Sequence, residues 1–156
     1  MASEPRLASA LLALLATTLL IGCDDGTGLG SELVELQIAR AVWVAEGPSD
    51  YKMTLFRGCE CLPEMTGPVE LVVRDGFVES RECTNTGGPV GADYADLFPH
   101  VDGLFDLIEE AVRQGASKLR VSYHPSLGYP LRISIDYLAQ VADDEVTYVL
   151  SELEPL

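Results

Sequence analysis

The run VELVVRDGFVESR at residues 69–81 decides how this chain folds. Two β-like stretches, residues 69–73 and 77–81, flank the pair Asp75 and Gly76. An Asp-Gly pair readily adopts the positive φ angles that a tight turn between antiparallel strands requires. The run therefore predicts a β-hairpin and, with it, an antiparallel sheet.

The segments before the hairpin predict a strand and a helix. Residues 51–55 alternate apolar and polar side chains, and Cys59 and Cys61 lie on the same face of this strand if it continues. Residues 31–46 have apolar side chains at helical spacing, with the first residue, a serine, as N-cap and the Gly-Pro pair at 47–48 as the end. The periodic apolar positions are Val34, Ile38, Ala41, Val42 and Ala45.

The segments after the hairpin predict a second helix and three more strands. Residues 84–100 show no clear period, and we expect them to cross the surface. Asp102 is a suitable N-cap and Gly115 a suitable C-terminal cap for a helix with a broad apolar face. That face comprises Leu104, Phe105, Leu107, Ile108, Ala111 and Val112. The three β-like runs are residues 118–123, 131–137 and 145–151.

The predicted order of elements is a helix and three strands, followed by a second helix and three strands. Two such halves, which share little residue identity, predict an α+β fold in which both helices pack on antiparallel sheet. A length of 156 residues fits one domain. We assign residues 31–156 to that single domain.

The charge of the chain argues against nucleic acid as a partner. The sequence has 25 acidic and 10 basic residues, for a net charge of -15, and the basic residues are scattered singly. Binding to phosphates needs clustered Lys or Arg side chains, and an acidic surface repels a polyanion. Basic partners or cations are compatible with this charge, which also serves solubility.

The N-terminus has the features of a bacterial lipoprotein precursor. Residues 7–21 form an apolar run that follows Arg6 and is too short for a comfortable transmembrane helix. The run LIGC at residues 20–23 resembles the lipobox of bacterial lipoproteins. The resemblance implies cleavage after residue 22 and attachment of diacylglycerol, with its fatty acyl chains, to the sulfur of Cys23. Residues 1–22 are then a signal peptide, residues 23–30 a flexible tether, and the domain lies in the cell envelope, outside the cytoplasm.

Three cysteines remain once Cys23 carries lipid: Cys59, Cys61 and Cys83. Disulfides form readily outside the cytoplasm, and a bond between cysteines two residues apart closes a small, strained ring. The hairpin folds the chain back and brings Cys83 toward the loop at residues 62–68, just before which Cys61 lies. We therefore expect a structural bridge between Cys61 and Cys83, with Cys59 as the alternative partner of Cys83.

The sequence indicates no catalytic residues, no cofactor and no metal site. It lacks a nucleophile elbow, a phosphate-binding glycine loop and a metalloprotease helix. His100 and His124 are far apart and lack the paired spacing of zinc ligands, and the aspartates lack the spacing of a calcium loop. We expect Trp43, Tyr51 and Tyr129 to pack in or beside the core.

Several segments together resemble a family of uncharacterised bacterial envelope domains of unknown function that often follow lipoprotein leaders. The resemblance covers most of residues 40–153. It rests on Trp43 and Tyr51 ahead of the C-x-C at 59–61, on the hairpin run at 71–76, on VDGLFD at 101–106, and on YHP and GYP at 123–125 and 128–130. His124 departs from the acidic residue expected there. The family has no activity to transfer to this chain.

These features predict a membrane-tethered, non-enzymatic binding or assembly module with a possible protein partner in the envelope. The alternative is a thiol-active envelope protein that uses Cys59, Cys61 and Cys83. The tandem halves also resemble the architecture of secreted inhibitors of β-lactamases, but similarity of fold does not establish function.

Overall fold

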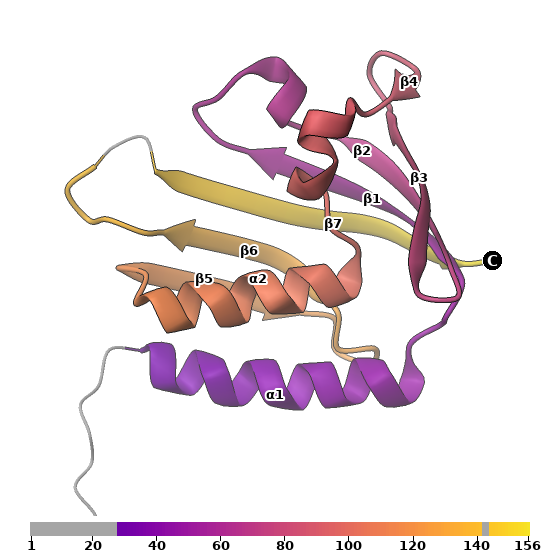
Figure 1. Ribbon diagram of the computed structural model, residues 1–156. Coiled ribbons are helices and arrows are strands. Elements are labelled where there is room, and N and C mark those ends of the chain that lie inside the picture. The colour runs from indigo at the N-terminus through magenta and orange to yellow at the C-terminus, as the bar shows by residue number, and fades with distance from the viewer. Residues whose placement is uncertain (1–27, 142–143) are drawn as a thin grey trace, which may run out of the picture.

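The computed structural model describes residues 28–141 and 144–156, which form one antiparallel sheet and two helices (Figure 1). The sheet has seven strands in the order β4-β3-β2-β1-β7-β6-β5. The strands are β1 (Tyr51–Gly58), β2 (Val69–Arg74), β3 (Phe77–Cys83), β4 (Gly88–Pro89), β5 (Lys118–Tyr123), β6 (Pro130–Asp136) and β7 (Glu145–Pro155). The helices are α1 (Leu29–Glu46) and α2 (Val101–Gln114), with two 3-10 helices, η1 (Pro63–Met65) and η2 (Ala92–Leu97). The predicted α+β fold with helices on antiparallel sheet is confirmed.

The hairpin forms where the Asp-Gly pair predicts it. Asp75 has φ 49° and Gly76 has φ 77°, so both adopt the left-handed conformation. The turn places Val73 opposite Val78 in the β2–β3 ladder. The backbone N–H of Asp75 also donates to Oδ1 of Asp50 at 2.8 Å, which ties the turn to the segment before β1.

The two halves of the chain join edge to edge in one sheet. β1, the first strand of the first half, pairs antiparallel with β7, the last strand of the second half, with Leu55 opposite Leu150. The pairing continues to the chain end, where the N–H of Leu156 donates to the carbonyl of Asp50 at 3.1 Å. The second half therefore closes onto the first through the C-terminus.

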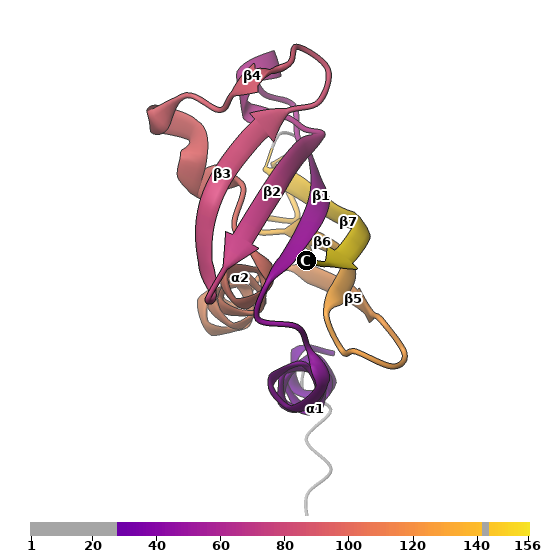
Figure 2. The ribbon, with the colours of Figure 1, turned by 90° about the vertical axis from the view of Figure 1, so that its right-hand side faces the viewer.

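The core lies between one face of the sheet and the helices. α2 contacts β6, and α1 contacts both α2 and β5, so the two helices lie together on one side (Figures 1 and 2). Alternate strand residues are buried beneath them, as the period of a half-buried strand requires. These include Tyr51, Met53, Leu55, Val69, Leu71, Val73, Ile133, Ile135, Tyr148 and Leu150.

Both helices begin earlier than their predicted caps. α1 starts at Leu29 with Gly28 as its N-cap, so its first turn takes up part of the predicted tether, and Ser31 lies inside the helix. The Ser31 hydroxyl donates to the Gly28 carbonyl at 2.7 Å. α2 starts at Val101, so Asp102 lies in the first turn, where a carboxylate still favours the helix dipole.

The face of α1 that packs on the protein differs from its periodic apolar stripe. Leu36, Ala39 and Trp43 are buried, whereas Ile38 has 62% of its surface exposed and Val34 has 57%. Apolar residues occur on more than one side of this helix, so its periodicity predicts a helix without marking the buried side. Within the described residues, no helix combines the length and the apolar character that a membrane crossing needs.

Candidate functional site

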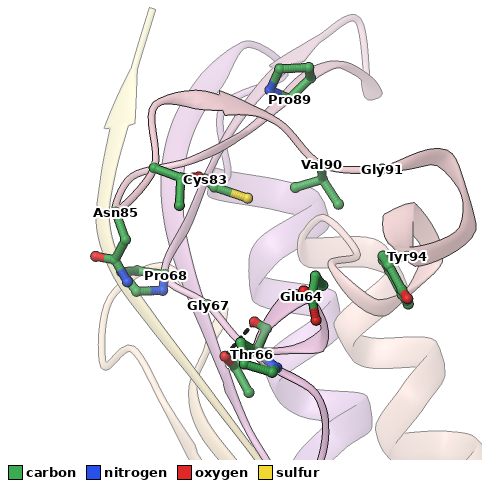
Figure 3. Close-up of a pocket in the computed structure, with 12 residues that line it drawn as sticks. Glu64, Thr66, Gly67, Pro68, Cys83, Asn85, Pro89, Val90, Gly91 and Tyr94 are labelled. Atoms are coloured by element: carbon green, nitrogen blue, oxygen red, sulfur yellow. Dashed lines mark hydrogen bonds between the residues drawn. The ribbon is translucent and has the colours of Figure 1, made fainter.

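A pocket of about 450 Å³ lies at the end of the sheet that carries β4, between η1, the β3–β4 turn and η2 (Figure 3). Figure 3 shows the sulfur of Cys83 directed into it. Its apolar lining comes from Pro63, Pro68, Pro89, Val90 and Tyr94. Its polar lining includes Glu64, Thr66 and Asn85. A mostly apolar hollow with a few polar groups is the usual form of a small ligand site.

Short hydrogen bonds fix the walls of this pocket. The N–H of Gly87 donates to the carbonyl of Cys83 at 2.8 Å, and φ 68° at Gly87 permits the tight turn between β3 and β4. The hydroxyl of Thr66 donates to the carbonyl of Pro63 at 2.8 Å and closes η1. The N–H of Tyr94 donates to Gly91 at 2.9 Å and begins η2. The pocket is therefore formed by three segments, each of which is stabilised by hydrogen bonds between its own residues.

Arg81 on β3 connects η2, which forms one wall of the pocket, to the sheet. Its Nε donates to the carbonyl of Phe98 at 2.8 Å, just after η2. Burial lowers the pKa of Arg81, and the nearby Asp96 carboxylate opposes that shift. Arg81 thus fixes where η2 returns to the core.

The charge of the lining restricts what the pocket can bind. Glu64 is the one acidic residue among the residues that line it, and no lysine or arginine is among them. A carboxylate with no basic neighbour in the lining disfavours an anion. The pocket therefore suits a neutral or cationic ligand with an apolar body.

The disulfide joins a different pair of cysteines from the predicted one. Cys59 is bonded to Cys61, with Cα atoms 5.3 Å apart, and Cys83 is a free thiol. The prediction of a Cys61–Cys83 bridge assumed that β1 continues through Cys61. The strand instead ends at Gly58 and the chain bends, which brings the two neighbouring sulfurs together. Cys83 lies opposite Val69 and points into the pocket (Figure 3).

Arg57 holds the disulfide from the end of β1. Its Nη1 lies 2.7 Å from the Cys59 sulfur and 3.4 Å from the Cys61 sulfur, and donates to the Met65 carbonyl at 2.9 Å. Its Nε donates to the hydroxyl of Tyr148 on β7 at 3.1 Å. The sequence interpretation did not include Arg57. The available signal was a cation two positions before a cysteine at the end of a strand, on the same side of the extended chain.

His124 and the aromatic residues around it have structural roles. Nδ1 of His124 accepts hydrogen bonds from the backbone N–H groups of Ser126 and Leu127, so this side chain holds the turn that follows β5. Its ring stacks on Tyr129, with centroids 4.7 Å apart. Trp43 meets Tyr129 edge to face at 6.0 Å and is buried, as expected for a core residue. The described residues bring no three potential metal ligands together.

Cys23 and the rest of the predicted lipoprotein leader lie outside the described residues. The described chain begins at residue 28, inside the predicted tether of residues 23–30.

The profile of a family of unknown function, DUF6174, matches residues 35–155. The chain belongs to this family, which confirms the predicted membership of a family without an assigned function. The match includes the C-x-C at 59–61, the hairpin and the pocket, and begins after the predicted leader. No curated protein and no solved structure matches the chain.

Proposed function

We propose that this protein is a lipid-anchored, non-enzymatic binding module of the bacterial cell envelope, and that the pocket between η1, the β3–β4 turn and η2 receives its ligand. The observation that carries the proposal is the apolar pocket at the end of the sheet. Loops held on a rigid sheet are the common location of binding sites.

The anchor is supported by the sequence at residues 20–23, which matches the lipobox pattern at the end of an apolar leader. Burying acyl chains contributes about 0.8 kcal/mol per CH₂ group, so two or three chains hold a protein on a membrane. α1 begins at Leu29, so the link from Cys23 spans at most about 20 Å. The domain would then act close to the membrane surface.

The ligand class follows from the lining. Prolines and Tyr94 offer rigid apolar surface, and Thr66 and Asn85 offer hydrogen-bonding groups. Glu64 favours a cationic group at the rim over an anionic one. We expect a compact, mainly apolar ligand group, neutral or cationic, presented by a partner protein in the envelope.

Site-specific photo-crosslinking in intact cells tests the pocket. A photoreactive amino acid at Tyr94 should capture a defined partner. The same group at Phe77 is the matched control, because this aromatic side chain is 78% exposed and lies at the opposite end of β3. The substitution Val90→Trp, which fills the pocket, should abolish capture from position 94. Equal capture from both positions, or capture that survives Val90→Trp, would contradict the proposal.

Membrane partitioning tests the anchor independently. The mature protein should carry a diacylglycerol mass on Cys23, and Cys23→Ala should release the protein from membranes. A Cys23→Ala protein that stays wholly in the membrane fraction would show that another element anchors it. Because the pocket and the anchor are separate, either part can fail alone.

A further inference from the structure

The Cys59–Cys61 disulfide can contribute little to the stability of the fold. The stabilisation that a bridge gives through the unfolded chain grows with the length of the loop it closes. A sequence separation of two closes a very short loop at the end of β1, in a chain already fixed there by the β1–β7 ladder. The expected Cys61–Cys83 bridge would have restrained the whole hairpin. Stabilisation of the fold therefore does not explain why these two cysteines are joined.

The Arg57 guanidinium contacts both sulfurs, a feature that an inert disulfide does not need. Arg57 places Nη1 at 2.7 Å from Cys59 and 3.4 Å from Cys61, so its charge lies closer to the Cys59 sulfur. A guanidinium at this distance stabilises a thiolate, the species that attacks or leaves in disulfide exchange. The Arg57 side chain is held in place from two other elements, by Tyr148 on β7 and by the carbonyl of Met65, the last residue of η1.

Cys59 and Cys61 are each partly exposed residues, so the pair lies at the surface, where an external thiol can approach it. Further charged groups lie beside Cys59 in a shallow depression on the open face of the sheet. They are Glu60, Arg132 and Glu145. The two carboxylates outnumber Arg132 by one charge, and Glu64 on η1 is exposed. Arg57 is the cation that directly contacts the sulfurs, and its positive charge opposes these carboxylates.

We infer that Cys59 and Cys61 form a thiol–disulfide exchange site, with Arg57 as the positioning residue that stabilises the Cys59 thiolate. The inference is independent of the pocket and of its ligand. It assigns a stoichiometric exchange with external thiols to the C-x-C pair, in addition to the proposed binding role of the pocket, and Cys83 has no part in it.

The exchange begins when the thiolate of an external thiol attacks the sulfur of Cys61. A bond forms between the two sulfurs, the Cys59–Cys61 bond breaks, and its electron pair leaves on Cys59 as a thiolate beside Arg57. A second thiolate of the same class then attacks the external sulfur of this mixed disulfide, and the electron pair of the broken bond leaves on Cys61 as a thiolate. The two external thiols are oxidised to one disulfide, and Cys59 and Cys61, which take up the two protons, are reduced to thiols. In reverse, the Cys61 thiolate attacks an external disulfide and releases one external thiol. The Cys59 thiolate then attacks Cys61 of the mixed disulfide, which restores the Cys59–Cys61 bond and releases the second external thiol.

Differential alkylation of the full chain tests this scheme. The Cys83→Ser protein is incubated with reduced and oxidised glutathione, quenched, and mapped by mass spectrometry, which reads Cys59 and Cys61 separately from Cys23. The pair should become reduced while circular dichroism shows a folded protein. In a Cys59→Ser, Cys83→Ser protein, glutathione should be retained on Cys61. A pair that resists glutathione in the folded protein would overturn the inference.

The role of Arg57 is tested by the pH profile of alkylation of Cys59 in a Cys61→Ser, Cys83→Ser background. Replacing Arg57 with Met should move the profile to higher pH and slow disulfide exchange by the Cys59–Cys61 pair on the order of tenfold. Arg57→Lys keeps a cation at this position, so it should retain most of the wild-type pH profile and exchange rate. A role in folding alone would lower the thermal midpoint and leave the pH profile where it was. An unchanged pH profile of Cys59 alkylation in a folded Arg57→Met protein would show that Arg57 does not stabilise the Cys59 thiolate.

Discussion

The two helices show opposite relations between sequence pattern and packing. In α2, the apolar positions at helical spacing are the buried ones: Leu104, Phe105, Ile108 and Ala111 all have at most 1% of their surface exposed. In α1, the regular apolar stripe faces outward, and Leu36, Ala39 and Trp43 on another side are buried. Periodicity predicted both helices correctly but identified the buried face of only one.

The difference arises from the residues opposite each stripe. The outer side of α2 carries Asp106, Glu109 and Arg113, so only one side of this helix can be buried without cost. α1 has apolar residues on more than one side, and its orientation is decided by the neighbours of Trp43. The Trp43 ring packs edge to face against Tyr51 at 5.5 Å and Tyr129 at 6.0 Å. A helix with two apolar sides therefore takes its orientation from the rest of the fold.

The largest expected effect is on α2. Phe105 is fully buried, stacks with Tyr123 and lies beneath the Arg40 guanidinium. Phe105→Ala should lower the free energy of unfolding by about 3–5 kcal/mol, because truncation removes apolar contact and leaves a cavity. Urea denaturation followed by the fluorescence of Trp43 measures this. A loss below about 1 kcal/mol would mean that this face of α2 is not the packed one.

A matched pair on α1 tests its orientation. Leu36 is 2% exposed, and Ile38, two positions away, is 62% exposed. Leu36→Ala should cost about 2–4 kcal/mol of unfolding free energy, whereas Ile38→Ala should cost less than about 0.5 kcal/mol. The same denaturation experiment compares them. The reverse order of effects would place the periodic stripe against the protein and remove the contrast with α2.

The helix ends offer a smaller contrast. Gly115 ends α2 in the left-handed conformation with φ 70°, whereas Gly47 ends α1 in an extended conformation. Gly115→Ala should destabilise by about 1–2 kcal/mol, because a Cβ disfavours that conformation. Gly115→Asn should cost less, since asparagine tolerates it. Thermal denaturation of the two variants checks the order, and equal stability would argue against a left-handed cap.

The smallest effect concerns the ion pairs that join the helices. Arg40 on α1 lies 2.7 Å from Asp106 and 3.3 Å from Glu109 on α2. Asp106 is largely exposed, so solvent screens the pair. A double-mutant cycle with Arg40→Met and Asp106→Asn should give a coupling energy of about 0.2–1 kcal/mol that falls as salt is added. A coupling that is insensitive to salt would indicate a pair less exposed than this one.

The predictable parts of the fold are those that local rules control. The Asp-Gly turn, the end of α2 at Gly115 and the strand starting at Lys118 occur where the sequence predicts them. The candidate site was less predictable. Its pocket is formed by segments from η1, the β3–β4 turn and η2, which the sequence showed only as stretches without a period. The disulfide depended on where β1 ends, and strand ends are set by pairing with neighbours.

Local patterns in the sequence account for the helices and strands, their order and the antiparallel hairpin, because alternation, helical spacing and turn residues act over a few positions along the chain. Tertiary structure decided which side of α1 is buried, which cysteines are joined and that Arg57 reaches both sulfurs. These outcomes depend on contacts between residues far apart in the chain, such as Arg57 with Tyr148 and Trp43 with Tyr129. No local pattern records such contacts, since each side chain has several neighbours it could pack against until the sheet order is fixed.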